Sequence, residues 1–472
     1  MTLTSRTTTV LAAIASLAMN SVALPAGAQT FNVLHAFGAT GDAQSPRGVV
    51  AQGQDGVLYG ATLKGGTNGV GGVFSVTTGG TETLLGSFDP STGGTGCNTG
   101  LLLARDGTFY GTCSGGVDPY SYGSVYSART KGFIVTISEN NPSTGSDPDE
   151  GQLTEGLDGT LYSVAATGGA NGGGTVFSVG SDGALVDIHD FGSGADDGVG
   201  PSGPLTLASD GNFYGTTSAG GKLGGGTVFK MTTTGQVTVL HDFPSEGKKE
   251  GIQPMGGVVE GDRGEFYGVT FSGGANDLGT VFALKQTGKV QILHSFSVAD
   301  SMAFPCDSLV LANDRNFYGE AAACKDGKCE GSAIFEVTSK GVFKLLHALS
   351  PTTDGTMASS PLLLDTNGTF YGLTESGGPN GGGTMYSLNT GLPPFASLSP
   401  SSGAIGATIN IYGQGFTQKG TKVSFKGVKA DFQLISANFL QAVVPAGATS
   451  GPVKVKTPGG TLQSIQTFTV SH

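Results

Sequence analysis

The sequence contains no tryptophan among its 472 residues. This absence argues against two kinds of exported repeat enzyme: quinone-dependent dehydrogenases, whose docking motifs typically carry tryptophan, and sialidases, whose Asp-box needs one. The recurring Asp-Gly pairs of this chain are therefore interpreted as tight turns, in which glycine supplies the positive φ that such turns demand.

Charged residues are also scarce, at 13% of the chain, and the net charge is −12. An acidic chain of this kind lacks the basic footprint of proteins that bind nucleic acid or anionic lipid. After the N-terminus, no run approaches the roughly 20 apolar residues of a membrane-spanning helix. We therefore expect neither a nucleic-acid partner nor a membrane span.

The N-terminus has the features of a processing segment. Arg6 is its only charge, residues 10–18 form an apolar run, and Ala26-Gly27-Ala28 offers the small residues of a cleavage site. We expect residues 1–28 to be a signal peptide, which predicts a secreted, periplasmic or cell-surface protein of a bacterium. The alternative is an ordinary buried first helix. No cysteine stands at the cleavage point, which argues against a lipoprotein anchor.

A repeat of about 52 residues runs through most of the chain. Its clearest mark is a tyrosine spaced 51 to 53 residues from the next, at Tyr59, Tyr110, Tyr162, Tyr214, Tyr267, Tyr318 and Tyr371. An Asp-Gly-like turn precedes each tyrosine, and a Gly-Gly pair follows six of them. A Thr-Val-Phe block and a Leu-His-x-Phe block complete most copies. Such self-similarity decides the fold.

One copy predicts four short antiparallel strands, at residues 204–209, 212–218, 227–232 and 236–243, and four strands per repeat make a propeller blade. A solenoid would need capping repeats of different composition, and none is visible. Residues 31–37 resemble an isolated fourth strand, whereas the seventh copy ends after its third. We therefore predict an all-β, seven-bladed β-propeller over residues 29–391, closed by the N-terminal strand.

These blocks resemble the GloVer-type tandem-repeat family of exported bacterial proteins, over roughly residues 31–390. The resemblance rests on the Asp-Gly-x-Phe-Tyr-Gly, Gly-Gly, Gly-Thr-Val-Phe and Val-Leu-His-x-Phe blocks. It implies export and a repeat architecture, with C-terminal anchors that vary among members and no assigned activity.

The repeat ends at Gly391, and residues 392–394 are expected to be a short stiff linker. Residues 395–472 show short alternating strands about ten residues apart, which predict an immunoglobulin-like β-sandwich. This part is similar to an IPT/TIG domain, which implies a spacer or an adhesive module. It lacks the basic loops that a DNA-binding member would need.

The five cysteines form no CxxC pair and have no histidine at zinc-ligand spacing. In an exported protein, we expect structural disulfides rather than a metal or redox site. Cys97 and Cys113 flank the first two strands of one unit. Cys324 and Cys329 flank an Asp-Gly turn, with Cys306 as an alternative partner of Cys324. One thiol is expected to remain free.

Five of the six histidines occupy the same repeat position, at His35, His189, His241, His294 and His347. A residue repeated in the outermost strand of five units is expected to serve packing and hydrogen bonding. No histidine is left to act as a unique catalytic base, which argues against Ser-His-Asp and Cys-His arrangements but leaves mechanisms that use carboxylates alone.

The Asp-Gly turns should lie on one face of the propeller and the variable Gly-Gly loops on the other, which we expect to be the binding face. Adjacent loops place acids there, at Asp147, Asp149, Glu150, Asp196 and Asp197. Such oxygen ligands can hold calcium, although a solvated acidic rim is the simpler interpretation. We expect no other cofactor.

The expected function is non-enzymatic: an exported binding or surface-structural protein whose ligand is a glycan, a cell-surface component or a protein. The alternative is a polysaccharide hydrolase or lyase that uses carboxylates at the mouth of the central channel. Two convergent carboxylates, or a carboxylate with an arginine, in a real pocket would favour the enzyme. A face filled by glycine backbone would favour the binding module. The oligomeric state stays open.

Overall fold

The computed structural model describes residues 29–471, except 40–41, 93, 98, 116–121, 131–133, 147, 149–150, 247–249, 326–327 and 359. The expected signal peptide lies outside the described residues. The described chain is built from strands and short 3₁₀ turns. No helix long and apolar enough to cross a membrane occurs in this part of the chain.

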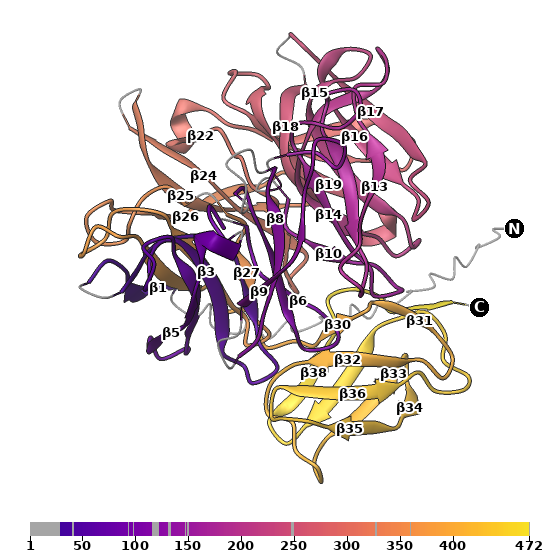
Figure 1. Cartoon of the computed structure of the whole chain (residues 1–472). Helices are drawn as coiled ribbons and strands as arrows, with labels where there is room; N and C mark the ends of the chain where they lie inside the picture. Colours follow the sequence, from indigo (N-terminus) through magenta and orange to yellow (C-terminus); the bar gives the residue numbers. More distant parts are fainter. Residues whose placement is uncertain are drawn as a thin grey trace, which may run out of the picture.

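Residues 30–389 form seven antiparallel sheets (Figure 1). The first sheet contains β2 (Ala43–Gln52), β3 (Leu58–Gly65), β4 (Gly72–Val76) and β5 (Glu82–Ser87), and the second contains β6 (Leu102–Leu103), β7 (Phe109–Cys113), β8 (Ser124–Ala128) and β9 (Ile134–Glu139). The third contains β10 (Thr154–Glu155), β11 (Leu161–Ala165), β12 (Thr175–Val179) and β13 (Leu185–Asp190). The fourth contains β14 (Gly198–Leu207), β15 (Phe213–Gly220), β16 (Gly224–Met231) and β17 (Val237–Pro244). The fifth and sixth are β18 (Gly251–Glu260), β19 (Phe266–Gly273), β20 (Thr280–Leu284) and β21 (Val290–Ser295); and β22 (Met302–Ala303), β23 (Val310–Leu311), β24 (Asn316–Lys325), β25 (Lys328–Thr338) and β26 (Phe343–Ala348).

The seventh sheet, here called the closing sheet, joins the two ends of the repeat region. It contains β27 (Leu363–Leu364), β28 (Thr369–Thr374), β29 (Thr384–Asn389) and the N-terminal strand β1 (Thr30–Ala36). β1 pairs antiparallel with β29, from Thr30 opposite Asn389 to Ala36 opposite Thr384. The N-terminal strand therefore supplies the outer strand of the last sheet, as predicted, and this pairing covers an edge that would otherwise be open.

The repeated tyrosine links each sheet to the next. In the first sheet, the Tyr59 hydroxyl donates to the carboxylate of the turn residue Asp55 at 2.7 Å, and its aromatic ring packs on Phe109 of the second sheet at 4.5 Å between centroids. The same contact recurs in the later copies, for example between Tyr214 and Phe266 at 3.9 Å. One side chain thus closes a local turn and fills the space between two twisted sheets.

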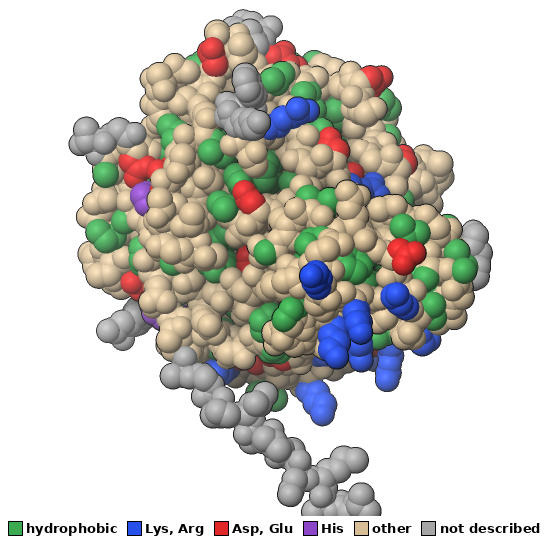
Figure 2. All heavy atoms as spheres, turned by 90° about the horizontal axis from the view of Figure 1, so that it is seen from below, with side chains coloured by type: hydrophobic (Ala, Val, Ile, Leu, Met, Phe, Trp, Pro, Cys, Tyr) green, Lys and Arg blue, Asp and Glu red, His purple; other side chains and the backbone are tan. Residues whose placement is uncertain are grey.

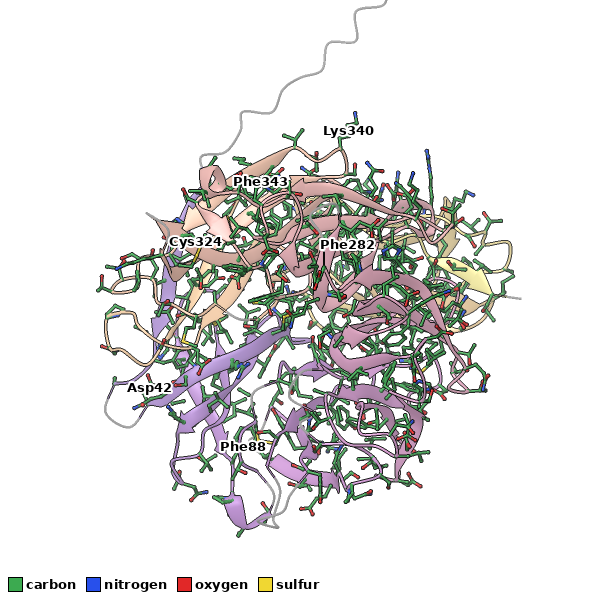
Figure 3. All side chains as sticks on the ribbon, turned by 90° about the horizontal axis from the view of Figure 1, so that it is seen from above. Asp42, Phe88, Phe282, Cys324, Lys340 and Phe343 are labelled. Carbon is green, nitrogen blue, oxygen red and sulfur yellow. A yellow bond between two sulfur atoms is a disulfide. The ribbon has the colours of Figure 1, made fainter. Side chains whose placement is uncertain are left out.

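Hydrophobic clusters lie between all neighbouring sheets of the described region. One of them joins the closing sheet to the first, through buried Phe37, Phe74, Leu373 and Met385. Because every sheet packs on two others, the sheets form a closed propeller, and Figure 3 views it from the end opposite the C-terminal domain. We call the side of the Asp-Gly turns the turn face and the side of the Gly-Gly loops the loop face.

The C-terminal domain, residues 395–471, is a β-sandwich (yellow in Figure 1). One sheet contains β30 (Ser397–Ser399), β32 (Thr408–Tyr412), β36 (Phe439–Val443) and β35 (Phe432–Leu434). The other contains β34 (Val428–Ala430), β33 (Lys422–Phe425), β37 (Val453–Thr457) and β38 (Gly460–Gln463), while β31 (Ser402–Ala404) pairs with β39 (Thr469–Ser471). Its core is a cluster of its own.

This domain docks on the turn face of the propeller. The Ser436 hydroxyl donates to the Gln54 carbonyl at 2.6 Å, and the Asn410 amide donates to the Arg105 carbonyl at 3.1 Å. The Phe395 N–H, just after the linker, donates to the Thr366 carbonyl at 3.0 Å. The two domains are thus joined by hydrogen bonds from several segments of the C-terminal domain, in addition to the linker.

Candidate functional site

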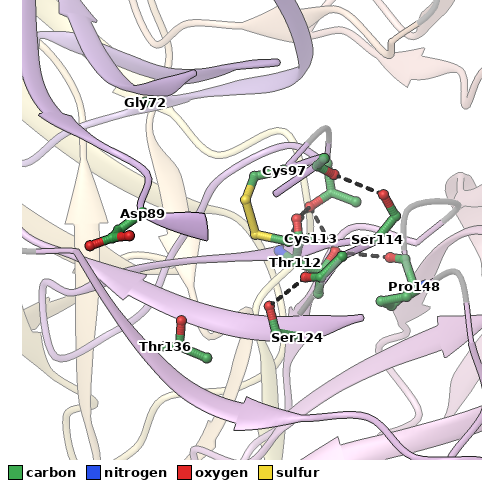
Figure 4. The surroundings of a disulfide bond; sticks show 12 residues. Gly72, Asp89, Cys97, Thr112, Cys113, Ser114, Ser124, Thr136 and Pro148 are labelled. Carbon is green, nitrogen blue, oxygen red and sulfur yellow. Dashed lines mark hydrogen bonds between the residues drawn. A yellow bond between two sulfur atoms is a disulfide. The ribbon is translucent and has the colours of Figure 1, made fainter. Parts of the chain in front are cut away.

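Both expected disulfides are present. Cys97 and Cys113 bond across the start of the second sheet and are fully buried, beside the Thr112 hydroxyl that donates to the Pro148 carbonyl (Figure 4). Cys324 and Cys329 join the tips of β24 and β25. Cys306 is the free cysteine, as one thiol was expected to be. Such bonds are typical of proteins in oxidising compartments.

The repeated histidines serve the structural role expected for them. All five lie in the outer strands, and each places Nε2 near the carboxylate of a nearby acid. The pairs are His35–Asp42 at 3.0 Å, His189–Asp197 at 3.7 Å, His241–Glu250 at 3.2 Å, His294–Asp300 at 3.1 Å and His347–Asp354 at 3.1 Å. These contacts hold the loop after each outer strand, and no histidine reaches a nucleophile in the described region.

The acidic rim proposed for calcium is only partly within the described residues. Asp147, Asp149 and Glu150 lie outside them. Asp197 accepts hydrogen bonds from the Ser193 backbone and hydroxyl and from the Gly198 N–H, whereas Asp196 is exposed. In the described part of the chain, no third metal-ligating side chain joins these two aspartates. Calcium binding at this rim stays a prediction.

The central channel is narrow because backbone fills it. Its cavity of about 90 Å³ is lined by all seven repeats. At Gly48, an added Cβ would lie 2.2 Å from the Gly100 nitrogen, and at Gly203 it would lie 2.3 Å from the Gly256 carbonyl carbon. Arg47 and Asp307 line this cavity, yet ligand sites usually occupy roughly 300 to 1,000 Å³.

A buried glutamate lies close to the channel. Glu320, on β24, is 2% exposed, and the Tyr386 hydroxyl of the closing sheet hydrogen-bonds to its Oε1. Burial, with a smaller contribution from Asp307, raises the pKa of Glu320 well above its usual value. Because no solvent reaches this carboxyl, it holds two sheets together rather than serving a substrate.

A cavity of about 630 Å³ lies between the turn face and the C-terminal domain. Three of its basic side chains pair with acids: Lys230 with Asp210 at 2.8 Å, Lys285 with Glu265 at 3.0 Å and Arg315 with Asp262 at 3.4 Å. These contacts occupy six of the charged groups at the cleft, whereas Glu260 and Arg263, which also line it, form no ion pair with described residues.

The electrostatics of this cleft do not suit glycoside hydrolysis. The hydrogen bond and charge of Lys285 hold the pKa of Glu265 below its usual value. Burial opposes ionisation of Asp210, but hydrogen bonds from Lys230, Asn212 and Tyr214 outweigh it and lower the pKa. A general acid needs the opposite shift, since it must carry a proton at neutral pH.

Unpaired positive charge gathers instead on the C-terminal domain. Residues 395–472 contain six lysines and one acid, Asp431, in a chain of net charge −12. Four exposed lysines share the outer surface of one sheet, and we call this surface the lysine face: Lys422, Lys429, Lys454 and Lys456. Seen from this end of the molecule, basic side chains collect in one area of the surface (Figure 2).

The lysine face follows from strand geometry. Val423 and Phe425 of β33, and Val453 and Val455 of β37, point into the core, so alternate residues point outward. Lys422 lies directly opposite Lys456, a pairing of like charges that costs stability. Among the described residues, none of these lysines forms an ion pair. The lysine face was not predicted from the sequence, although the alternation Lys454-Val455-Lys456 is its signal.

Comparison with protein families confirms the two resemblances drawn from the sequence. Residues 98–329 match the model of the Gloeobacter/Verrucomicrobia repeat, and residues 393–470 match the model of the IPT/TIG domain. The chain therefore contains both. No curated protein matches the sequence.

Solved structures share the fold at low identity. Virginiamycin B lyase from Staphylococcus aureus is 13% identical, with a TM-score of 0.51 over 76% of this chain and 99% of that chain. A fungal alcohol oxidase of the AA5 family, in complex with copper, is 13% identical, with a TM-score of 0.50 over 94% of this chain and 99% of that chain. Similarity at this level supports a common architecture and carries no activity across.

Proposed function

We propose that this chain is an exported, non-enzymatic binding protein whose C-terminal domain attaches to an anionic glycan of the cell surface. The lysine face is the observation that carries the proposal. Four exposed lysines on adjacent strands present positive charge that the described chain leaves unpaired, at a cost to the domain's own stability. A polyanion laid across the strands would remove that cost.

The chemistry of the neighbouring side chains favours a glycan over a nucleic acid. Lys454 lies opposite Gln463 and Lys456 lies opposite Thr461. Ser424 lies between Lys429 and Lys454 of the two neighbouring strands. Amide and hydroxyl groups suit hydrogen bonding to sugar hydroxyls. Single-stranded nucleic acid would call for aromatic side chains on which bases stack, and the described sheet presents none on this surface. Export, which the disulfides support, brings the protein to surface glycans rather than to nucleic acid.

The enzymatic alternative has less support. The central cavity of about 90 Å³ is small for a sugar ring with its neighbours. Asp210, Asp262 and Glu265 at the interdomain cleft are ion-paired, and the pKa values of Asp210 and Glu265 are lowered rather than raised. A hydrolase or lyase would need a carboxyl that can deliver or accept a proton at the substrate.

Binding of the full mature chain to polygalacturonate, measured by biolayer interferometry against neutral dextran, tests the proposal. We expect binding to polygalacturonate alone and a steady loss of affinity as salt rises. The double variant Lys422→Gln/Lys456→Gln should bind at least about tenfold more weakly, because each lysine near an anionic surface contributes on the order of 1 kcal/mol. The matched control Lys289→Gln/Lys340→Gln removes two propeller lysines and should bind like the parent.

Three outcomes would contradict the proposal. Equal losses in the two double variants would mean that net charge, rather than the lysine face, governs binding. Tighter binding to duplex DNA than to polygalacturonate would assign the face to nucleic acid. Release of new reducing or unsaturated ends from the bound polymer would restore the hydrolase or lyase alternative.

A further inference from the structure

One position of the repeat holds an acid in the first sheet and an apolar residue everywhere else. Glu82 begins β5, where it pairs with Val76 of β4. The residue in the same register is apolar in the other six sheets, at Ile134, Leu185, Val237, Val290, Phe343 and, in the closing sheet, Phe31. Folding of a blade therefore does not require an acid at this position.

Glu82 lies where the propeller closes. It faces His35 of β1, which belongs to the closing sheet, and Asp42, which precedes β2 of the first sheet. One ligand atom from each of the three side chains lies within 4.8 Å of the other two. His35 Nε2 is 3.0 Å from Asp42 Oδ2. Figure 3 places Asp42 at the outer edge of the molecule, so the cluster sits near the surface.

The charge of this cluster is not balanced by the protein. Glu82 Oε1 is inaccessible to solvent and has no hydrogen-bond partner. Neither carboxylate forms an ion pair with lysine or arginine in the described chain. Burial, followed by the charge of Asp42, raises the pKa of Glu82. A carboxylate oxygen that is shielded from water and lies beside a second acid is costly unless a cation joins the two groups.

The other histidine pairs show what the same position does without a third ligand. The His294 imidazole stacks on the Phe343 ring at 4.1 Å between centroids, and His347 stacks on Phe31 at 3.9 Å. There, the neighbouring sheet covers the histidine with an apolar ring. Only in the first sheet does it offer the histidine a carboxylate.

We propose that His35, Asp42 and Glu82 bind one divalent transition-metal ion of the Zn²⁺ class. One imidazole nitrogen with two carboxylate oxygens is a ligand set for such ions, and a water molecule would complete the coordination. Calcium is a poorer match, because it prefers six to eight oxygen ligands. The ion would join β1 of the closing sheet to β5 of the first sheet, and so fasten the propeller at the one place where the chain is not continuous.

Metal analysis and thermal melting of the untagged mature protein test this site. After chelator treatment, dialysis against micromolar Zn²⁺ should restore one ion per chain. The propeller melting temperature should rise by at least about 2 °C as the site saturates. Hydrogen exchange of residues 30–37 should slow on zinc binding, because the ion anchors β1.

The variant Glu82→Leu places in the first sheet the residue that stands at position 185. It should fold, melt at least as high as the metal-free parent, and lose both the bound zinc and the thermal response. The matched control Asp354→Asn alters an equivalent histidine pair and should keep both. Zinc binding equal to the parent in Glu82→Leu, or no zinc bound by the parent, would overturn the proposal. A shift with millimolar Ca²⁺ but none with Zn²⁺ would overturn the assignment of the ion.

Discussion

Substitution of Phe37 by alanine tests whether the N-terminal strand is an integral part of the propeller. Phe37 follows β1 directly, is fully buried, and packs edge-on against Phe74 of the first sheet at 5.0 Å. Truncation of a buried phenylalanine to alanine costs about 3 to 5 kcal/mol, through lost burial and the cavity left behind. We expect Phe37→Ala to lower the free energy of unfolding by this full amount, because the aromatic ring fills the space between the closing sheet and the first sheet.

The expected change in melting temperature follows from the size of the propeller. Unfolding entropy near 60 °C is about 2.1 cal/mol/K per residue, so roughly 360 residues that melt together change by about 0.8 kcal/mol/K. A loss of 3 to 5 kcal/mol then lowers the propeller transition by about 4 to 7 °C. Differential scanning calorimetry measures this transition directly.

Phe243→Ala is a matched control within a continuous part of the chain. Phe243 is also fully buried, and it packs against Phe282 at 5.3 Å, much as Phe37 packs against Phe74. His241 lies edge-on to Phe243 at 4.7 Å, and His35 lies edge-on to Phe37 at 4.6 Å. Equal losses in the two variants would support closure by β1. A change below about 1 °C in Phe37→Ala, with the full loss in Phe243→Ala, would refute it, because β1 would then detach without opening the propeller.

Three further predictions concern buried polar groups and a disulfide. Burial raises the pKa of Asp365 to about 6, so its ionised form destabilises the fold above that pH, and this penalty disappears as the pH falls towards 4. Asp365→Asn should therefore raise the free energy of unfolding by about 2 to 3 kcal/mol at pH 8 and by little at pH 4.5, as measured by urea unfolding. Tyr386→Phe leaves Glu320 without its partner and should cost about 1 to 3 kcal/mol, whereas Tyr386→Phe with Glu320→Val should recover most of it in the same assay. Replacing Cys97 and Cys113 by alanine opens a loop of sequence separation 16 and should lower stability by about 3 kcal/mol relative to the oxidised parent, as followed by thermal melting without reductant.

The strand arrangement could be predicted from the sequence because its determinants are local. Each Asp-Gly turn fixes a hairpin within a few residues, and β1 was recognisable because residues 31–37 repeat a block whose neighbours are missing. The Cys324–Cys329 disulfide followed from the same reasoning, since two cysteines across a tight turn face each other in adjacent strands. In every case, the information lies within one repeat or in the comparison of two.

The docking of the C-terminal domain could not be predicted in this way. It depends on single contacts between distant residues, such as the Gln414 amide that donates to the Thr366 hydroxyl at 2.9 Å. The loop face was expected to be the binding face because its loops vary. The structure places the 630 Å³ cavity and the C-terminal domain on the turn face, whose repeated Asp-Gly turns were interpreted as purely structural. Variation among the loops of the seven copies shows only that the fold tolerates different loops. It does not show which face contacts another domain.

The most informative residues of the repeat are the acids that break its pattern. Glu82 replaces an apolar residue of the first sheet, Glu320 stands in register with Val269 of the fifth, and Asp365 stands in register with Ala208 of the fourth. Each contacts or adjoins the closing sheet: Glu82 faces His35 of β1, Glu320 meets Tyr386 of β29, and Asp365 lies in the turn after β27. These residues are overlooked when the seven copies of the repeat are compared only for the positions that they share.

Their location suggests a role in choosing the correct partner for β1. Seven similar sheets offer β1 seven similar third strands, in its own chain or in a second copy, and exchange of such a strand is a common route to dimers. Buried polar contacts in some proteins fix one pairing among several at a cost in stability. We therefore expect the combined variant Glu82→Leu/Glu320→Val/Tyr386→Phe/Asp365→Ala, which leaves no Tyr386 hydroxyl without a partner, to be at least as stable as the parent but to select the partner of β1 less strictly. Refolded at high concentration, it should give more strand-exchanged dimer than the parent in size-exclusion chromatography with light scattering, and an unchanged monomer fraction would show that burial of apolar side chains alone selects the partner of β1.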